Sequence, residues 1–444
     1  MDIYNYFSQP ESRKLEFKRQ FPAKSDLLKT IVAFANGAGG NLIIGVSDKE
    51  REIAGVTDPL ELEERIANLV YDSIKPLVSP YISVHNINGK SILNVQILAG
   101  SNKPYFLVKD GPQNGVYIRI GSTNRKAGPD IINEITRQRL GYSFEEEILP
   151  SLSYKDLDIH ALKTFFSDIG SIKAEFDLLS KWHILKKNNG DYLPTVLSVI
   201  LFGKESLNAF DFMNIRLTRF NGLDYSDISE TKEFSIPLIL NIDEIINEMK
   251  RLVKRTSMLE GARRVEKTVI PDFALREVLV NAIVHRDYSM TGSSIKINIF
   301  DDRLQVISPG VLFGNLDISD LGQGVSESRN RRMVRIFRKL GFMEELGTGI
   351  SRIYKLYQEN NLKRPEFIEQ GQFFVTILPQ IEQLSDLSFS IYELVKTYRE
   401  ITVQELAQKL NVHKNTVLKY LSLLVKEKKI NRTGKGKNTK YTVS

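Results

Sequence analysis

The feature that most restricts how this 444-residue chain can fold is a short alternation of charged and apolar residues near its start. From Lys14 to Lys18 the two kinds of residue alternate, which is the period of a strand with one buried face. Such a strand would bury Leu15 and Phe17 and would present Glu16 and Lys18 on its other face. The segment therefore predicts a strand that brings an acid and a base to one surface.

A helix and a second strand are predicted directly after it. Ser25 is placed to cap a helix that Gly37 would end. The apolar residues of this helix are Leu27, Leu28, Ile31, Val32 and Ala35. The run from Leu42 to Val46 is short and apolar, which favours a buried strand, and Asp48 follows its end. The two strands could bring the acids beside them together.

Three carboxylates and a lysine belong to these strands and their flanks: Glu11, Glu16, Asp48 and Lys18. Clustered carboxylates repel one another unless a cation lies among them, and oxygen ligands suit Mg²⁺ or Mn²⁺. Such a cluster beside a lysine is suited to metal-assisted phosphodiester chemistry. On the residues alone, the alternative that these acids are solvated side chains stays open.

Four motifs recur in a recognisable order: the string from Glu11 to Lys18, residues 33–48, Lys103-Pro104-Tyr105, and Val116–Ser122. Together they resemble the AlbA-like domain of the Schlafen superfamily over residues 8–130. The resemblance implies that Glu11, Glu16 and Asp48 form a metal-binding catalytic triad that cuts structured RNA such as tRNA. We expect Lys18 to steady the phosphate. Many bacterial relatives are instead described as regulators with a DNA-binding domain.

The net charge of +7 is concentrated at one end of the chain. Residues 409–444 contain ten Lys or Arg and one acid, a net charge of +9, whereas residues 1–408 carry −2. A basic excess confined to one segment indicates a local contact surface for a polyanion such as nucleic acid. The chain contains no cysteine, which excludes disulfides and thiolate metal sites.

A helix is predicted for residues 271–288, with proline in its first turn. Glu277, Asn281 and His285 follow one another at intervals of four residues, so their side chains share one helix face. A hairpin is predicted next, with strands at 295–300 and 304–307, followed by Ser308-Pro309-Gly310. This order brings a polar helix face close in sequence to a sharp turn.

Gly347 and Gly349 precede another predicted helix, which begins at Ile350. Glycines at the start of a helix allow backbone N–H groups to approach an anion such as phosphate. The Ser328–Arg332 cluster could also face phosphates, or could be the solvated start of a helix. The region therefore predicts an anion-binding site without fixing its ligand.

The order of these motifs resembles a divergent GHKL ATPase fold. The resemblance implies that Glu277 activates water, Asn281 binds magnesium, and Gly310, Gly347 and Gly349 surround a bound ATP. One departure is that Ser308 replaces the aspartate that reads the adenine amino group in that family. We therefore expect nucleotide binding more than hydrolysis. The alternative is a structural scaffold in which residues 285–288 hold a turn.

The C-terminal segment has three amphipathic helices, at 391–398, 402–410 and 414–426, followed by strands at 429–433 and 439–443. Thr402 and Glu405 form a capping box, and this order is typical of a winged helix-turn-helix. The predicted core residues are Val417, Leu418, Leu421, Leu424 and Val425. The predicted nucleic-acid contacts are His413, Lys414, Asn415, Thr416, Lys419, Arg432, Lys435, Lys437 and Lys440. A protein–protein adaptor is the alternative.

We therefore expect an α+β multidomain protein. The predicted domains are a Schlafen AlbA-like domain at 1–141, a connector at 142–245, a divergent GHKL-like domain at 246–381 and a winged helix-turn-helix at 385–444. The start of the chain lacks a basic and apolar leader, and no apolar run is long enough to span a membrane, so a cytoplasmic protein without a membrane partner is expected.

Two functions of different class agree with these features. The first is a metal-dependent endoribonuclease, and the intact acidic triad favours it narrowly. The second is a non-catalytic, ATP-binding regulator that reads DNA through the winged helix. Either function requires a nucleic-acid partner, RNA or DNA. Because Schlafen nucleases pair two AlbA-like lobes and only one copy is present here, a homodimer is expected.

Overall fold

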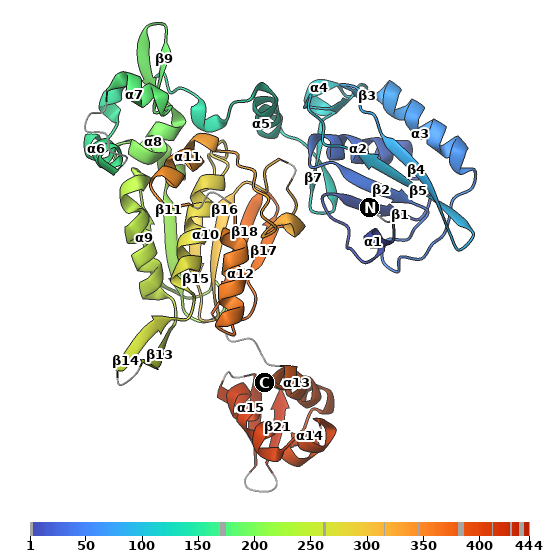
Figure 1. The fold of residues 1–444 in the computed structure, drawn as a ribbon, viewed down its shortest axis with the longest axis vertical. Coiled ribbons are helices and arrows are strands. Elements are labelled where there is room, and N and C mark those ends of the chain that lie inside the picture. The colour runs from blue at the N-terminus through green and yellow to red at the C-terminus, as the bar shows by residue number, and fades with distance from the viewer. Residues whose placement is uncertain are drawn as a thin grey trace. The chain divides into compact units, whose positions relative to one another are not determined.

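The computed structural model describes residues 3–168, 175–260, 263–314, 316–343, 347–380, 386–410, 412–426, 429–434 and 439–443. The chain divides into two compact units, one made of residues 1–356 and 365–380 and the other of residues 357–364 and 381–444. Helices and several separate sheets alternate along the chain (Figure 1), which confirms the predicted α+β multidomain class. None of the described helices is long and apolar enough to cross a membrane.

The N-terminal part of the first unit is built on a four-stranded sheet with the order β1-β2-β5-β4. Its strands are β1 (Leu15–Lys18), β2 (Gly40–Ile44), β4 (Tyr81–Ile87) and β5 (Lys90–Ile97). The first two strands are parallel, because helix α2 (Lys24–Asn36) crosses between them, and the remaining neighbours are antiparallel. The strand–helix–strand pattern predicted from the sequence is therefore present.

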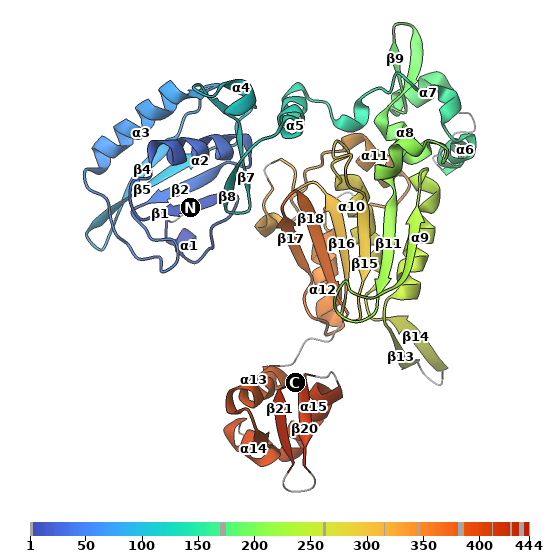
Figure 2. The same cartoon turned by 180° about the vertical axis from the view of Figure 1, so that it is seen from behind.

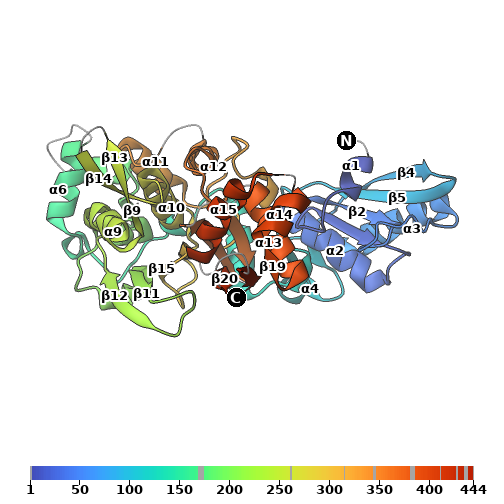
Figure 3. The same ribbon diagram turned by 90° about the horizontal axis from the view of Figure 1, so that it is seen from below.

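Helices cover both faces of this sheet. Figures 1 and 3 show α2 and α3 (Pro59–Ser73) on one face and the short α1 (Tyr4–Phe7) on the other. Helix α2 ends at Gly37, as predicted, but its N-cap is Ala23, so Ser25 lies within the first turn instead of capping it. The apolar residues predicted for α2 are buried against the sheet.

Smaller elements close the N-terminal part. A hairpin of β7 (Tyr117–Ile120) and β8 (Thr123–Lys126) packs on α2, and it places Arg119 beside β1. Helix α5 (Pro129–Leu140) follows and leads out of this part of the chain. The other elements are β3 (Ile74–Lys75), β6 (Phe106–Leu107) and α4 (Gly111–Asn114).

The next segment is a small helical region. Its best-buried element is α8 (Val196–Phe202), whose residues are all inaccessible to solvent, in agreement with the apolar run in the sequence. The remaining elements are η1 (Phe144–Glu146), η2 (Tyr154–Asp156), α6 (Ile159–Asp168), α7 (Phe176–Lys181), β9 (Leu185–Asn188), β10 (Asp191–Pro194) and η3 (Asn208–Met213).

A six-stranded sheet with the order β12-β11-β15-β16-β18-β17 forms the rest of the first unit. Its strands are β11 (Ile215–Phe220), β12 (Ile228–Phe234), β15 (Ile295–Ile299), β16 (Arg303–Pro309), β17 (Glu366–Gln370) and β18 (Phe373–Pro379). The domain boundary predicted between residues 245 and 246 does not fit this topology. It falls inside a helix, and the two strands before it extend the sheet, because β12 pairs with β11 and β11 pairs with β15.

Three helices lie on one face of this sheet: α9 (Leu238–Leu252), α10 (Asp272–His285) and α12 (Gly349–Glu359). Figure 1 shows them in front of the strands, and Figure 2, from behind, shows the strands in front of them. Helix α10 packs against β16, which fixes the direction of its polar face. The remaining elements are β13 (Arg255–Glu260), β14 (Arg263–Thr268), η4 (Ile318–Asp320) and α11 (Arg331–Lys339).

The C-terminal unit contains α13 (Asp386–Tyr398), α14 (Val403–Leu410), α15 (Lys414–Lys426) and a sheet of β19 (Ile401–Thr402), β21 (Lys440–Val443) and β20 (Ile430–Thr433). The Thr402 hydroxyl and the Glu405 carboxylate cap α14 reciprocally, as the sequence predicts. Val417, Leu421 and Leu424 are buried in the core. Leu418 is 44% exposed, so its assignment to the core was wrong.

Candidate functional sites

The first candidate site is the acidic cluster around strand β1. Leu15 and Phe17 are buried, as the alternating pattern predicts. Glu16, expected on an open face, is only 6% exposed. The strand is covered on both sides, because α1 packs on one and Arg119 of β7 reaches over the other. Glu16 is therefore a buried carboxylate, and a buried charge requires partners.

Two cations of the protein itself supply those partners. Arg119 Nη2 binds one carboxylate oxygen of Glu16, and Lys18 Nζ binds the other. Arg119 also donates through Nε to the carbonyl of Ser12 at 2.6 Å and through Nη2 to the carbonyl of Leu15 at 3.2 Å. Both oxygens of Glu16 are thus occupied, and the same guanidinium fixes the backbone on either side of residues 13 and 14.

Glu11 and Asp48 lie close enough to Glu16 to complete an acidic cluster. Burial raises the pKa of Glu11, and the negative charges of Glu16 and Asp48 raise it further. The bond that Glu11 Oε1 accepts from the Phe17 N–H, at 2.8 Å, opposes that rise. Asp48 is exposed and pairs with Arg51 at 3.0 Å. The structure therefore brings the three predicted acids together, but each already has a partner.

A divalent metal does not fit this arrangement of donors. Ions such as Mg²⁺ need carboxylate oxygens that are free to coordinate, and those of Glu16 are held by Arg119 and Lys18. Within the described residues, no group of three or more His, Cys, Asp or Glu side chains is placed to hold a metal ion. The predicted metal triad is present as a cluster whose charge the protein balances itself.

The second candidate site is a cavity beside α10. All five residues predicted from the second set of motifs line it: Glu277, Asn281, Gly310, Gly347 and Gly349. Its walls are otherwise largely apolar, with Val278, Val306, Leu312, Phe367 and Phe374 among the lining residues. An apolar cavity with a few polar groups at fixed positions is the usual form of a small-molecule site.

The glycines of this cavity are required by close approach. A Cβ atom on Gly349 would lie 1.8 Å from Glu277 Oε1, and one on Gly310 would lie 2.6 Å from Arg329 Nη1. Gly310 and Gly347 also have φ values of +105° and +62°, which side chains rarely adopt. Asn281 Nδ2 donates to Glu277 Oε1 at 3.1 Å. The carboxylate, the amide and the start of α12 therefore meet at one point.

Ser308 occupies the position where the GHKL resemblance expects an adenine-reading aspartate. It lines the cavity, but its Oγ donates to the carbonyl of Ala282 at 2.9 Å, so the hydroxyl proton is committed to α10. Thr376, on the neighbouring strand β18, also lines the cavity and was not predicted. A single polar residue within the apolar run of residues 373–379 was the signal in the sequence.

The turn after α10 lies next to this cavity and is fixed by buried side chains. Arg286 is fully buried and donates to the carbonyls of Phe212, Met290 and Ser293 at 3.1, 3.0 and 2.6 Å. Burial lowers the pKa of His285 to about 4, so its imidazole is neutral near pH 7. These contacts agree with the alternative that residues 285–288 hold a turn.

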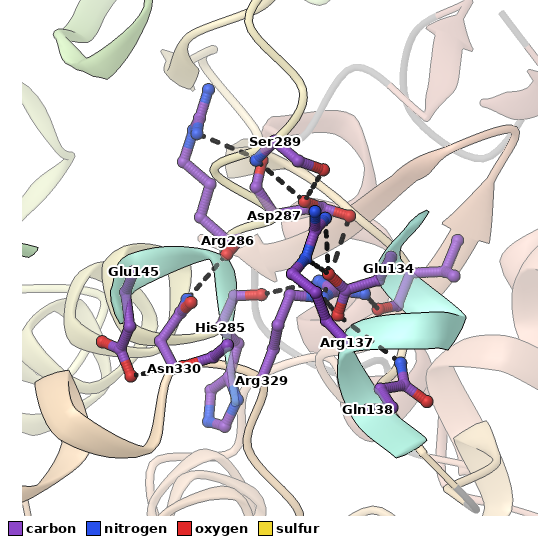
Figure 4. Close-up of polar contacts among 12 residues, drawn as sticks. Glu134, Arg137, Gln138, Glu145, His285, Arg286, Asp287, Ser289, Arg329 and Asn330 are labelled. Atoms are coloured by element: carbon purple, nitrogen blue, oxygen red, sulfur yellow. Dashed lines mark hydrogen bonds and ion pairs between the residues drawn. The ribbon is translucent and has the colours of Figure 1, made fainter. Parts of the chain in front are cut away.

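Arg329 joins this turn to helix α5, and Asn330 holds the turn itself (Figure 4). Arg329 Nε lies 3.5 Å from a Glu134 oxygen and 3.8 Å from an Asp287 oxygen. Asn330 Nδ2 donates to the carbonyls of Val284 and Arg286 at 2.9 and 2.7 Å. Both side chains are buried, so a solvated helix start is wrong for these two residues, whereas the phosphate contact stays a prediction.

The predicted nucleic-acid contacts of the C-terminal unit are mostly exposed. His413, Lys414 and Asn415 are exposed at the start of α15, where His413 Nδ1 accepts a bond from the Asn415 N–H, and Thr416 is half-buried. Arg432 is exposed, and Lys440 pairs with Glu400 at 2.7 Å. The side chain of Lys419 and residues Lys435 and Lys437 lie outside what the structure describes.

Two segments of the chain match known protein families. Residues 11–128 match the family described as "Schlafen, AlbA_2". Residues 292–378 match the family described as "Putative ATP-dependent DNA helicase recG C-terminal". No curated protein matches the chain.

Two solved structures are similar to it. The DIP2311 protein from Corynebacterium diphtheriae is 18% identical, with 97% of this chain and 92% of that chain covered and a TM-score of 0.46. The N-terminal domain of a putative ATP-dependent DNA helicase RecG-related protein from Nitrosomonas europaea is 25% identical, with 28% of this chain and 89% of that chain covered and a TM-score of 0.22. TM-scores this low say nothing about function.

The two family matches contain the two candidate sites in part. The Schlafen match covers Glu11, Glu16 and Asp48, and the recG-type match covers Gly310, Gly347 and Gly349. The α10 residues Glu277 and Asn281 precede the second match and reach it through the cavity. Residues 11–128 are therefore a Schlafen AlbA_2 domain, and residues 292–378 belong to an ATPase-like domain of the recG C-terminal type.

Proposed function

We propose that this protein is a nucleotide-responsive regulator that binds nucleic acid, with ATP as the nucleotide and duplex DNA as the main target. The observation that carries the proposal is the single cavity surrounded by Glu277, Asn281, Gly310, Gly347 and Gly349. These residues come from segments up to about 70 positions apart in sequence, and they leave space between them instead of filling it.

The cavity supports binding more than turnover. Its apolar walls suit a base, and the glycines that precede α12 leave backbone N–H groups accessible to phosphate. A magnesium ion that accompanies the nucleotide would be held by Asn281, and it would supply charge neutralisation of the phosphates. Because Ser308 offers no carboxylate to the adenine amino group, we expect modest discrimination between ATP and GTP.

The C-terminal unit is proposed as the nucleic-acid reader. Its three helices and three-stranded sheet have the order of a winged helix-turn-helix, and α15 presents exposed polar residues at its start. The net charge of +9 over residues 409–444 supplies a sequence-independent attraction to phosphates. A Schlafen AlbA_2 domain in the same chain supports the same class of partner.

Calorimetry with Mg²⁺ and a non-hydrolysable ATP analogue tests the nucleotide site. The wild type is expected to release or absorb heat on binding, and Asn281→Ala is expected to bind less tightly. Asn247→Ala is the matched control, because Asn247 is exposed on α9 and does not line this cavity. Absence of any binding heat from the wild type would refute the proposed nucleotide site.

A second candidate function, a metal-dependent endoribonuclease, is favoured by one observation. Glu11 is influenced by the charges of both Glu16 and Asp48, so the three acids lie within electrostatic reach of one another. This activity would require Glu16 to separate from Arg119 and Lys18. Incubating tRNA with the wild type and Glu16→Ala, with Mn²⁺ or with EDTA, distinguishes the two functions. Intact tRNA in every arm, with duplex DNA still retarded in a gel, would leave only the regulator.

The expected homodimer and the cytoplasmic location are part of the same proposal. A regulator that binds a two-fold symmetric operator is normally a two-fold symmetric dimer. Light scattering of the purified full chain measures its mass directly. A mass of one chain at micromolar concentration would refute the dimer without affecting the nucleotide site.

A further inference from the structure

One segment forms a wall that the nucleotide cavity shares with the Schlafen domain. Residues 310–313 line the nucleotide cavity, and they also line a second cavity whose other walls include Arg13 and Arg119 of the Schlafen domain. Leu316 lines the nucleotide cavity as well. Any ligand that contacts this wall from one side therefore acts on a surface that the Schlafen domain contacts from the other.

Arg13 is the side chain that makes this contact. Its Nη1 donates to the carbonyls of Leu312 and Leu316 at 3.2 and 3.0 Å and binds Glu369 Oε1 at 3.2 Å. Glu369 Oε1 also accepts the Leu312 N–H at 2.8 Å. Arg13 and Glu369 are both largely buried, so their charge-assisted bonds are shielded from water.

Glu369 belongs to a strand that also lines the cavity. It lies on β17 two residues after Phe367, and alternate residues of a strand point to the same face. Phe367 lines the nucleotide cavity. The partners of Arg13, which are Leu312, Leu316 and strand β17, are therefore parts of the cavity wall.

The backbone of Arg13 lies next to the acidic cluster. Arg13 lies between Ser12 and Leu15, whose carbonyls are the two that Arg119 holds. Arg119 also binds Glu16. Lys14, next to Arg13, binds Asp320 at 2.5 Å and adds a second link between the domains. The side chain of Arg13 thus contacts the cavity wall, and its backbone lies in the segment that Arg119 holds beside Glu16.

We infer that Arg13 is a positioning residue through which occupancy of the nucleotide cavity acts on the acidic cluster of the Schlafen domain. The inference rests on the proposed nucleotide site. A ligand that fills the cavity restrains the wall at Leu312 and Leu316, so the acceptors of Arg13 become more fixed. Strand β1 and the Arg119–Glu16 pair are then held more firmly. The coupling is reciprocal, because whatever the nucleotide does to β1 must appear in nucleotide affinity.

Hydrogen exchange on the full chain, with and without Mg²⁺ and a non-hydrolysable ATP analogue, tests this link. In the wild type the nucleotide should slow the exchange of residues 11–18 several-fold while leaving β4 unchanged. Arg13→Gln should abolish this protection and weaken nucleotide binding by about fivefold, a coupling of about 1 kcal/mol. Glu369→Gln breaks the same link from the other domain and serves as the second variant where Arg13→Gln fails to fold.

Arg19→Gln is the matched control. Arg19 follows β1, is 61% exposed and pairs with Glu52, so its loss should leave the protection intact. Nucleotide binding by the wild type without slower exchange at residues 11–18 would overturn the inference and leave the nucleotide site standing. Protection that persists in both Arg13→Gln and Glu369→Gln would also overturn it. No binding by the wild type would overturn both the inference and the proposed function.

Discussion

The acidic cluster around Glu16 and the cavity beside α10 both contain a glutamate, but the surroundings of the two carboxylates differ. Around Glu16 the protein supplies the countercharges itself, through Arg119 and Lys18, and burial closes the site. Beside Glu277, which accepts a bond from the neutral amide of Asn281, the adjoining glycines leave room. The spacing of acidic residues in the sequence therefore predicts where a site lies. The neighbouring cations and the free space around the acids determine whether a ligand can bind there.

The same contrast bears on the proposed coupling between the two sites. A cluster whose charges are already balanced needs an outside cause to change, and the cavity is where such a cause can bind. Arg13 joins them, since it contacts the cavity wall and lies between the two residues that Arg119 holds.

Removing the guanidinium that closes the acidic cluster should have the largest effect. Arg119→Ala leaves the buried Glu16 without its main partner, and breaking a buried ion pair from one side costs about 3–5 kcal/mol of unfolding free energy. Glu16→Gln in the Arg119→Ala background should restore part of that loss, because the unpaired charge is gone. Chemical denaturation measures all three proteins.

Arg19→Ala is the control for this prediction. Arg19 makes an exposed pair with Glu52, and such pairs contribute about 0–1 kcal/mol. Equal stability of Arg119→Ala and Arg19→Ala would mean that the cluster is open in solution, and the comparison between the two sites would then lose its basis.

Glu145 is a buried carboxylate outside both sites, and its contribution to stability should depend on pH. It binds the backbone N–H groups of Arg332 and Met333 at 2.7 and 2.9 Å. Burial raises the pKa of Glu145 from its ordinary value of 4.5 to about 7. Because the folded pKa is the higher one, its contribution is fully present below about pH 4.5 and is lost as pH rises to about 7.

Glu145→Gln should therefore match the wild type in stability near pH 4.5 and exceed it near pH 8 by up to about 3 kcal/mol. Comparing the two proteins at each pH removes the opposite trend of His285. The pKa of that residue is lowered to about 4, so its contribution is lost as pH falls. A stability difference that stays constant between pH 4.5 and 8 would contradict the prediction.

Local patterns in the sequence predicted the elements and the cavity residues, but not the partners of the charges. Alternation located β1, and the four-residue spacing of Glu277 and Asn281 placed them on one face. The bonds from Arg119 to Glu16 and from Arg13 to Leu316 join residues about 100 and 300 positions apart. Periodicity carries no information about contacts of that range, so the burial of Glu16 was missed.

The domain boundary and the exposed Leu418 have similar explanations. Strands β11 and β12 look like a separate connector in sequence, because the pairing of β11 with β15 joins residues some 80 positions apart, such as Ile215 and Ile295. Leu418 has the spacing of a core residue on α15, yet this small unit buries only the face nearest α13 and α14. In both cases the outcome depends on tertiary contacts with residues far away in the sequence, which a local sequence pattern does not include.

On the cavity side, a single methyl group should block the nucleotide. In Gly349→Ala the new Cβ would lie 1.8 Å from Glu277 Oε1, so the carboxylate must move. Overpacking of this kind costs about 1–3 kcal/mol, which corresponds to nucleotide binding that is about 5- to 150-fold weaker. Calorimetry with the non-hydrolysable ATP analogue measures the change.

Gly292→Ala is the control for this substitution, since a Cβ there would have no neighbour within 4 Å. It should bind the analogue as the wild type does. Unchanged affinity in Gly349→Ala would show that nucleotide binding does not depend on the position of Glu277. The cavity would then not differ from the acidic cluster in the way described above.

The smallest effect is expected in the C-terminal unit, where the same rule about paired charges applies. Lys414 is exposed at the start of α15, whereas Lys440 binds Glu400 at 2.7 Å. A lysine that neutralises a phosphate contributes about 0.9 to the salt slope of duplex binding, so Lys414→Ala should lower that slope by about 0.9. Lys440→Ala should lower it less, because Glu400 already offsets part of its charge. Fluorescence anisotropy with labelled DNA at several salt concentrations measures both slopes. If both variants lower the salt slope equally, Lys440 must leave Glu400 to bind a phosphate. Ion pairs in the free protein would then not predict which lysines bind DNA.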